Sequence, residues 1–183
     1  MGHASIRGWT AQETVTAVDA PVQIEPYDPA WPEAFLAERE LLTRVLAPWL
    51  VGPIEHVGST AVPGLAAKPV IDIMAPVKDL ESSRASLAAL EAIGYCHSPY
   101  KAEVEHWLCK PDPGHRTHHL HLVPLDSRLW IERLAFRDLL ASDASVARDY
   151  AALKYRLAAA HRNDRERYTE EKGPFIERAL RRL

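Results

Sequence analysis

The chain has 183 residues, of which 47% are hydrophobic and 26% are charged, and its formal net charge is −3. These values are typical of one globular domain with a substantial core, and they exclude extensive disorder. The slightly acidic balance excludes a basic field over the whole molecule, so we expect no nucleic-acid partner. The two cysteines, Cys96 and Cys109, are too few for a disulfide framework or a four-cysteine zinc site, and they suit a reducing cytoplasm.

The N-terminal segment carries no targeting signal that we recognise. No apolar run of the chain approaches the roughly 18 residues of a transmembrane helix, and residues 1–20 lack the apolar core of a signal peptide. We therefore expect a cytoplasmic protein without membrane association. Residues 1–21 are interpreted as a flexible tail, and residues 22–183 as a single domain.

The first elements of the domain are a short strand and a helix. Residues 22–24 are predicted to form the strand. Asp28 and Pro29 predict a helix start, and Gly52 and Pro53 follow its end. Helical spacing predicts its apolar face: Phe35, Leu42, Val45, Leu46 and Trp49.

The middle of the chain alternates short strands with loops. A strand over residues 54–57 runs directly into Gly58, Ser59 and Thr60. Residues 61–69 are rich in proline and glycine, which predicts a loop. The small residues therefore stand at the turn between a strand and a loop.

A buried strand and a helix come next. Residues 70–74 form an apolar, β-branched run interrupted by one carboxylate and flanked by Pro69 and Pro76, which predicts a buried strand. Asp79 then predicts the cap of a helix that ends at Gly94.

A hairpin and a helical block complete the chain. Residues 106–110 and 117–123 are predicted strands, and the turn signal between them lies at residues 111–114. Helices are predicted over residues 129–140, over residues 146–162 and in a last segment ending at Leu183. Strands mixed with helices, followed by a helical C-terminal part from about residue 129, predict an α+β fold, or α/β with a mixed sheet.

The first candidate for chemistry is the turn Gly58-Ser59-Thr60. Small residues with backbone N–H groups can cradle a phosphate, and the two hydroxyls can add hydrogen bonds. The alternative is a simple turn. The glycine spacing matches neither a Walker loop nor a dinucleotide-binding fingerprint.

The second candidate is a carboxylate with two imidazoles. Asp72 stands in an apolar strand, where a carboxylate is costly to bury unless it is paired or binds a metal. His119 and His121 share one face of their predicted strand, and together they can hold a metal or a phosphate. The alternatives are an Asp72 paired with an arginine or with backbone, and a half-exposed polar face for the histidines.

The third candidate is basic. Lys68 lies in the loop four residues before Asp72, and Arg116 and Lys172 could add positive charge to the same region. For residues on terminal helices the alternative is an ordinary solvated face. The three cations are candidates for neutralising a phosphorylated ligand.

Taken together, these segments resemble the GrpB-like family over residues 22–183. The most specific motif is HVGSTAVPGLAAKPVIDI at residues 56–73. The resemblance continues through EHW at 105–107, RTHHLHLV at 116–123, FRD at 136–138 and YTEEK at 168–172. The family is placed in the DNA polymerase beta-like nucleotidyltransferase superfamily, and related domains occur fused to dephospho-coenzyme A kinase.

The resemblance implies a nucleotidyltransferase-like mixed sheet flanked by helices. In the superfamily pattern a Gly-Ser turn precedes an Asp-x-Asp/Glu strand, and a neighbouring strand supplies a third carboxylate. Here Asp72 matches the first carboxylate, but Met74 takes the second position, and His119 or His121 takes the third. Such a donor set favours Mn²⁺ or Zn²⁺ over Mg²⁺, or no metal at all.

Two functions are compatible with this pattern. In the first, the protein is an enzyme that binds ATP or another phosphorylated molecule and catalyses nucleotidyl or phosphoryl transfer, or adenylation-dependent ligation of a carboxylate substrate. Asp72, His119 and His121 would act as catalytic or metal-binding residues. In the second, it is a non-catalytic nucleotide- or cofactor-binding module. Apolar surface on the terminal helices could also support a homodimer.

Overall fold

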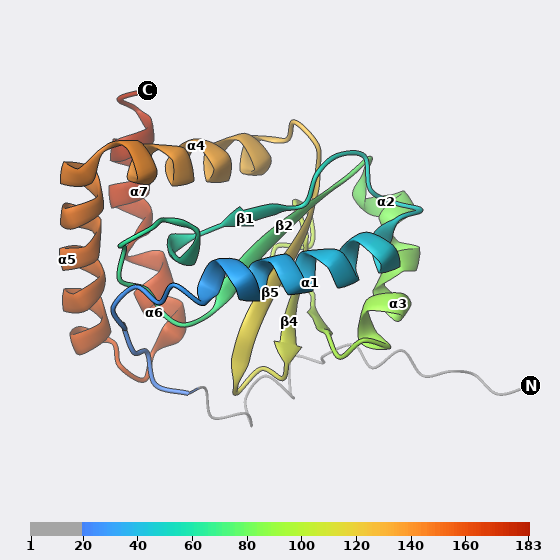
Figure 1. The fold of residues 1–183 in the computed structure, drawn as a ribbon, viewed down its shortest axis with the longest axis horizontal. Coiled ribbons are helices and arrows are strands. Elements are labelled where there is room, and N and C mark those ends of the chain that lie inside the picture. The colour runs from blue at the N-terminus through green and yellow to red at the C-terminus, as the bar shows by residue number, and fades with distance from the viewer. Residues whose placement is uncertain (1–19) are drawn as a thin grey trace, which may run out of the picture.

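The computed structural model describes residues 20–183, and its centre is a five-stranded mixed β-sheet (Figure 1). The strand order is β1-β2-β5-β4-β3. β2 and β5 are parallel, whereas the other neighbours are antiparallel. The strands are β1 (Glu55–Val57), β2 (Ile71–Val77), β3 (Cys96–Ser98), β4 (His106–Pro111) and β5 (Arg116–Pro124).

Helices surround this sheet in three groups. In Figure 1, α1 crosses in front of the sheet, α2 and α3 lie at one end, and α4 to α7 stand together at the other side. The predicted α+β class with a mixed sheet and a helical C-terminal part is confirmed. The helices are α1 (Trp31–Leu46), α2 (Leu80–Ser83), α3 (Leu87–Glu91), α4 (Arg128–Ser142), α5 (Ala144–Ala160), α6 (Arg165–Glu170) and α7 (Gly173–Leu180).

The two faces of the sheet have different roles, because side chains alternate along a strand. Ile71 and Ile73 of β2 and Leu120 and Leu122 of β5 pack beneath α1 in the main core. The side chains between them in sequence therefore lie on the opposite face. That face carries the polar residues of interest.

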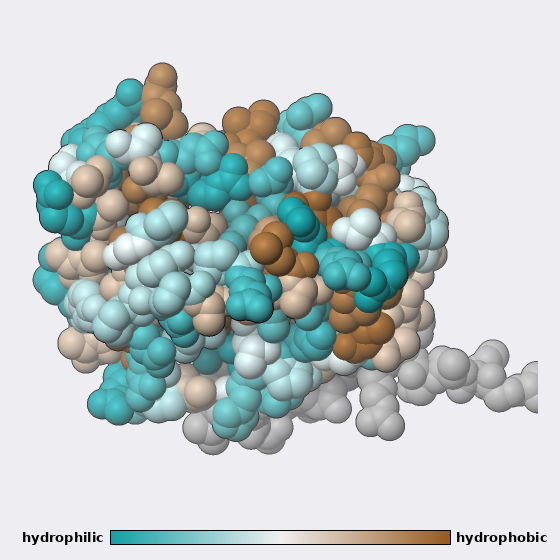
Figure 2. Space-filling model, viewed as in Figure 1, coloured by the Kyte–Doolittle hydropathy of each residue, from teal (hydrophilic) through white to brown (hydrophobic). Residues whose placement is uncertain are grey.

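The outer surface on the α1 side of the molecule contains both hydrophilic and hydrophobic residues. Figure 2 views this side and shows hydrophilic residues interspersed with smaller hydrophobic areas. Leu36 on α1 and Val51 are among the exposed apolar side chains.

The N-terminal part of the domain departs from the prediction in two places. The described residues at 22–24 form no strand, because Val22 donates its backbone N–H to Arg162 and Glu25 pairs with Ala67 in an isolated bridge. The helix begins at Trp31 rather than at Asp28, whose carboxylate accepts from the Ala30 N–H in a turn before the helix. The predicted tail lies, up to residue 19, outside the described residues.

β2 runs through Pro76, where the sequence predicted its end. The Pro76 carbonyl accepts from the Val51 N–H, on the side of the strand away from β5. The N–H that proline lacks would point to that same side, so the pairing of Pro76 with Val123 is not interrupted.

Short elements account for the remaining differences. β3 was not predicted, since its three residues, Cys96–Ser98, include no β-branched side chain. The helix predicted from Asp79 is divided into α2 and α3 by a 3₁₀ turn at Arg84–Ser86. The predicted last helix is two helices, α6 and α7, with Lys172 between them.

Candidate functional site

A cavity of about 570 Å³ lies on the sheet face opposite α1. Its floor is formed by β2, β4 and β5, and residues of α4 to α7 form one wall. All the predicted site residues except Thr60 line it: Gly58, Ser59, Lys68, Asp72, Arg116, His119, His121 and Lys172. Segments that are far apart in the sequence therefore meet at one place.

Thr60 has a structural position instead. Its side chain is buried, and its hydroxyl donates to the Val70 carbonyl at 3.3 Å. His56 Nε2 lies 3.0 Å from the same hydroxyl, and the His56 ring stacks on Phe35. Thr60 thus ties the turn after β1 to the start of β2, outside the cavity.

The parallel pairing of β2 with β5 brings the carboxylate to the imidazoles. Asp72 is the register partner of His119, and His121 follows two residues later on the same face. His119 Nδ1 lies 2.8 Å from Asp72 Oδ1, so its N–H donates to the carboxylate. One potential ligand atom from each of the three residues lies within 4.8 Å of the others. All three side chains line the same cavity.

Burial and pairing set the charge states of the first pair. Burial raises the pKa of Asp72, but the hydrogen bond from His119 and the charges of His119, His121 and Arg133 outweigh it and hold that pKa below its ordinary value. Burial lowers the pKa of His119 to about 4, because the interactions with Asp72 offset only part of the desolvation. At neutral pH the pair is therefore a carboxylate beside a neutral imidazole.

A second carboxylate holds the other histidine. Glu105 Oε2 lies 2.5 Å from His121 Nδ1, and the two side chains are only 1% and 5% exposed. Burial raises the pKa of Glu105, but the charges of His121 and Arg133 and the hydrogen bond outweigh it and leave that pKa lowered. Glu105 was not among the predicted site residues. In the sequence, Glu105 was indicated only by its place in EHW at residues 105–107, one of the segments that resemble the GrpB-like family.

The Gly58 backbone approaches Asp72 closely. Gly58 has φ +71°, a backbone conformation that residues other than glycine rarely adopt. A Cβ at this position would lie 2.9 Å from Cβ of Asp72 and closer still to its Oδ2. The glycine is therefore needed for this turn to pack on Asp72.

Cations line the side of the cavity near α6. The ammonium groups of Lys68 and Lys172 lie 5.3 Å and 4.4 Å from the centre of the Tyr168 ring. Burial lowers the pKa of Lys68 to about 7 and that of Lys172 to about 8, with mutual repulsion adding to the shift of Lys68. A bound anion would favour the charged form of both, which makes this side suited to phosphate or carboxylate groups.

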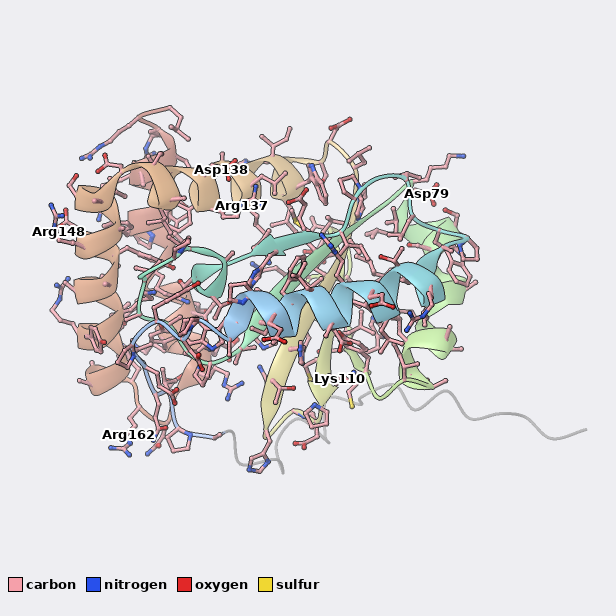
Figure 3. The ribbon with its side chains drawn as sticks, viewed as in Figure 1. Asp79, Lys110, Arg137, Asp138, Arg148 and Arg162 are labelled. Atoms are coloured by element: carbon pink, nitrogen blue, oxygen red, sulfur yellow. The ribbon has the colours of Figure 1, made fainter. Side chains whose placement is uncertain are left out.

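Arg116 and Arg137 differ in how they are held. The Arg116 guanidinium lies over the Trp107 ring at 5.2 Å. Arg137, on the side of α4 that faces β1 in Figure 3, donates to Glu55 at 2.7 Å and to the His56 carbonyl at 3.1 Å. Arg137 therefore connects α4 to the strand that precedes the Gly58 turn.

α4 and α7 also bring apolar side chains to the cavity. They recur at helical spacing, beside the charged Glu132, Arg133 and Arg137 of α4: Leu129, Phe136, Leu140, Ile176 and Leu180. Met74, at the second carboxylate position, is fully buried against Val57, Val123 and Trp130. The floor thus carries no carboxylate at that position.

The chain matches the family model described as GrpB protein over residues 21–182. It belongs to the GrpB family. A UPF0157 protein of Pseudomonas aeruginosa is 41% identical over 93% of this chain and 71% of its own length. The crystal structure of the conserved protein GrpB from Enterococcus faecalis superimposes with a TM-score of 0.77 at 34% identity, covering 87% of this chain and 98% of that one.

GrpB-like sequence also occurs within a longer relative. A dephospho-CoA kinase of Mycolicibacterium paratuberculosis is 30% identical over 89% of this chain, which spans 46% of that protein. Among the described residues of the GrpB-family chain, none of the helices is both long and apolar enough to cross a bilayer. The cytoplasmic location and the homodimer stay predictions.

Proposed function

We propose that this GrpB-family protein is an enzyme whose cavity binds ATP or another small phosphorylated molecule. Its reaction is the transfer of a nucleotidyl or phosphoryl group, or the adenylation-dependent ligation of a carboxylate substrate. One observation carries the proposal: a carboxylate–imidazole group and a set of half-buried cations line the same cavity. Phosphoryl transfer needs both positioned positive charge and a group that handles a proton or a metal.

The cavity residues have different proposed roles according to their positions. Lys68, Lys172 and Arg116 neutralise the phosphates, and the Ser59 hydroxyl adds a hydrogen bond beside Gly58. Asp72 accepts a hydrogen bond from the Nδ1–H of His119, which orients the ring. Nε2 is thereby left to bind a metal or to take up a proton. The apolar side chains of α4 and α7 exclude water from the reacting groups and accommodate the less polar part of the substrate.

A divalent ion, Mn²⁺ or Zn²⁺ rather than Mg²⁺, would be held at His119 and His121, with Asp72 beside them. When bound, such an ion supplies charge neutralisation of the reacting phosphate.

The test combines binding and turnover. Titration calorimetry with ATP, with and without Mn²⁺, is followed by a pyrophosphate-release assay with pooled carboxylate and alcohol substrates. Ser59→Ala is expected to weaken ATP binding by about 1–2 kcal/mol, or roughly 5–30-fold. Ser142→Ala is the control, since the Ser142 hydroxyl bonds back to the Asp138 carbonyl on the exposed side of α4. Absence of ATP and phosphate binding in the unmodified protein would reject the proposal.

A second candidate is a binding module without transfer activity. The buried Met74 favours it, because one of the carboxylates used by the nucleotidyltransferase pattern is missing. ATP binding without pyrophosphate release or phosphoryl transfer to any pooled substrate would support the module over the enzyme.

A further inference from the structure

The donor atoms in the cavity do not suit the magnesium ion that a nucleotidyltransferase pattern implies. Mg²⁺ prefers oxygen ligands in an octahedral arrangement and keeps several waters. The candidate triad offers one carboxylate and two imidazoles, and the fully buried Met74 takes the position of the next carboxylate. Imidazole nitrogen is instead a preferred ligand of zinc and other transition metals.

Each imidazole is held by its own carboxylate. His119 donates through Nδ1 to Asp72 at 2.8 Å, and His121 donates through Nδ1 to Glu105 at 2.5 Å. In a neutral ring, a proton on Nδ1 leaves Nε2 with a free lone pair. Carboxylates that hold metal-binding histidines in this way are typical of protein metal sites.

The two Nε2 atoms are the strongest indication of a ligand. Both are buried, and neither has a hydrogen-bond partner within the described part of the chain. The His121 side chain is 5% exposed, so solvent cannot readily satisfy it. An unsatisfied buried polar atom is costly, and two such atoms in one cavity call for a shared partner.

We infer that the cavity holds a transition-metal site of the zinc or manganese class, in which Nε2 of His119 and Nε2 of His121 are the protein ligands. Asp72 holds the His119 ring from its Nδ1 side and is a positioning residue. Glu105 does not touch the metal and is a positioning residue that fixes the ring and proton of His121. The inference deepens the proposed function and rests on it, because it names the metal of the same cavity.

The charges around Glu105 are consistent with that positioning role. Arg133 of α4 lies 3.8 Å from the second oxygen of Glu105. The buried carboxylate, 1% exposed, therefore has His121 on one side and a guanidinium on the other. This arrangement keeps Glu105 charged and directed at Nδ1.

The decisive measurement uses the unmodified, metal-free protein. Long-range ¹H–¹⁵N NMR identifies which ring nitrogen carries the proton, and we expect Nδ1–H for both His119 and His121. One equivalent of Zn²⁺ should shift the Nε2 resonances of both rings and saturate at one ion per chain, whereas millimolar Mg²⁺ should leave them unchanged. Nε2–H rings, zinc binding that leaves both rings unshifted, or equal responses to Mg²⁺ and Zn²⁺ would overturn the inference.

Variants then test Glu105. Glu105→Gln keeps the size and an acceptor but removes the charge, and we expect Zn²⁺ affinity to fall about 10–100-fold. Glu132→Gln is the matched control, because Glu132 lines the same cavity but is 40% exposed and binds Arg128; its Zn²⁺ affinity should not change. Equal affinities of the two folded variants would exclude the role of Glu105. Should Glu105→Gln unfold, the tautomer of His121 in the unmodified protein still decides.

The metal site and the proposed function can each fail without the other. Stoichiometric zinc on both imidazoles without any binding of ATP or phosphate would support the metal site and reject the proposed function. ATP binding by a protein whose histidines never respond to zinc would do the reverse.

Discussion

At the scale of single residues, Asp72 supplies the negative charge that holds the His119 ring. Asp72→Asn is nearly isosteric, but it removes the negative charge that accepts the His119 proton at 2.8 Å. We expect ATP affinity in the presence of Mn²⁺ to fall at least tenfold, while the thermal unfolding temperature changes by only a few degrees. Calorimetry and circular dichroism measure the two effects. Asp138→Asn, on the exposed side of α4, is the control.

The opposite pattern would assign Asp72 a purely structural role. In that case Asp72→Asn would lower the unfolding temperature sharply, and the remaining folded protein would bind ATP as before.

Substitutions of two glycines test whether the Gly58 turn supports Asp72. Gly58 and Gly64 both have positive φ, +71° and +78°, but a Cβ on Gly64 would meet nothing within 4 Å. Gly64→Ala should therefore cost only the strain of its positive φ, about 1–2 kcal/mol. Gly58 has ψ −172°, in a region used almost only by glycine, so Gly58→Ala adds both strain and a collision with Asp72. It should lose more stability, measured by chemical denaturation, and also ATP affinity, measured by calorimetry. Equal ATP affinities of the two folded variants would mean that Gly58 does not support Asp72.

At the scale of elements, the side of the cavity near α6 that carries the cations is formed by a loop and by the junction of two helices. Lys68 comes from the loop between β1 and β2, Lys172 lies between α6 and α7, and both flank the Tyr168 ring. Neither segment could be placed beside the other from the sequence, since a solvated lysine and a half-buried lysine have the same local pattern.

The lowered pKa values of these lysines predict the pH dependence of anion binding. Lys68 and Lys172, with pKa values of about 7 and about 8, lose their protons as pH rises from 6.5 to 9. The second pKa of a phosphate group is about 6, so above pH 7 the ligand charge is nearly constant. ATP affinity should therefore fall about tenfold or more across this range, measured by calorimetry at constant ionic strength.

Arginine supplies the control for this prediction, because its guanidinium stays charged at every pH in the range. In Lys68→Arg with Lys172→Arg, the fall in affinity with pH should flatten. A pH dependence that is the same in this variant would show that other groups cause it.

At the scale of the whole molecule, the cavity joins the sheet to the C-terminal helices. Its lining runs from Gly58 after β1 to Leu180 at the end of α7. A ligand that contacts both parts should stabilise the whole domain by about 2.7 kcal/mol when present at 100 times its Kd. ATP or phosphate should also slow amide hydrogen exchange in α6 and α7. Protection confined to the β1–β2 turn would contradict a site that spans both parts.

Much of this organisation could be predicted from the sequence by itself. The motif at residues 56–73 and the hairpin of β4 and β5 are local patterns, and strand alternation already placed His119 and His121 on one face. The periodicity of Phe35, Leu42 and Leu46 likewise identified the side of α1 that packs on the sheet. These features follow from short-range backbone geometry, so the sequence carries them directly.

Only the tertiary structure decided which distant residues meet. Parallel pairing of β2 with β5 sets Asp72 against His119 across 47 positions of sequence, and Glu105 reaches His121 from before β4. The structure also placed Thr60 outside the cavity and carried β2 through Pro76. The physical reason is that burial, pKa and pairing depend on neighbours from other elements. Two carboxylates can therefore fix two imidazoles only once the sheet has formed.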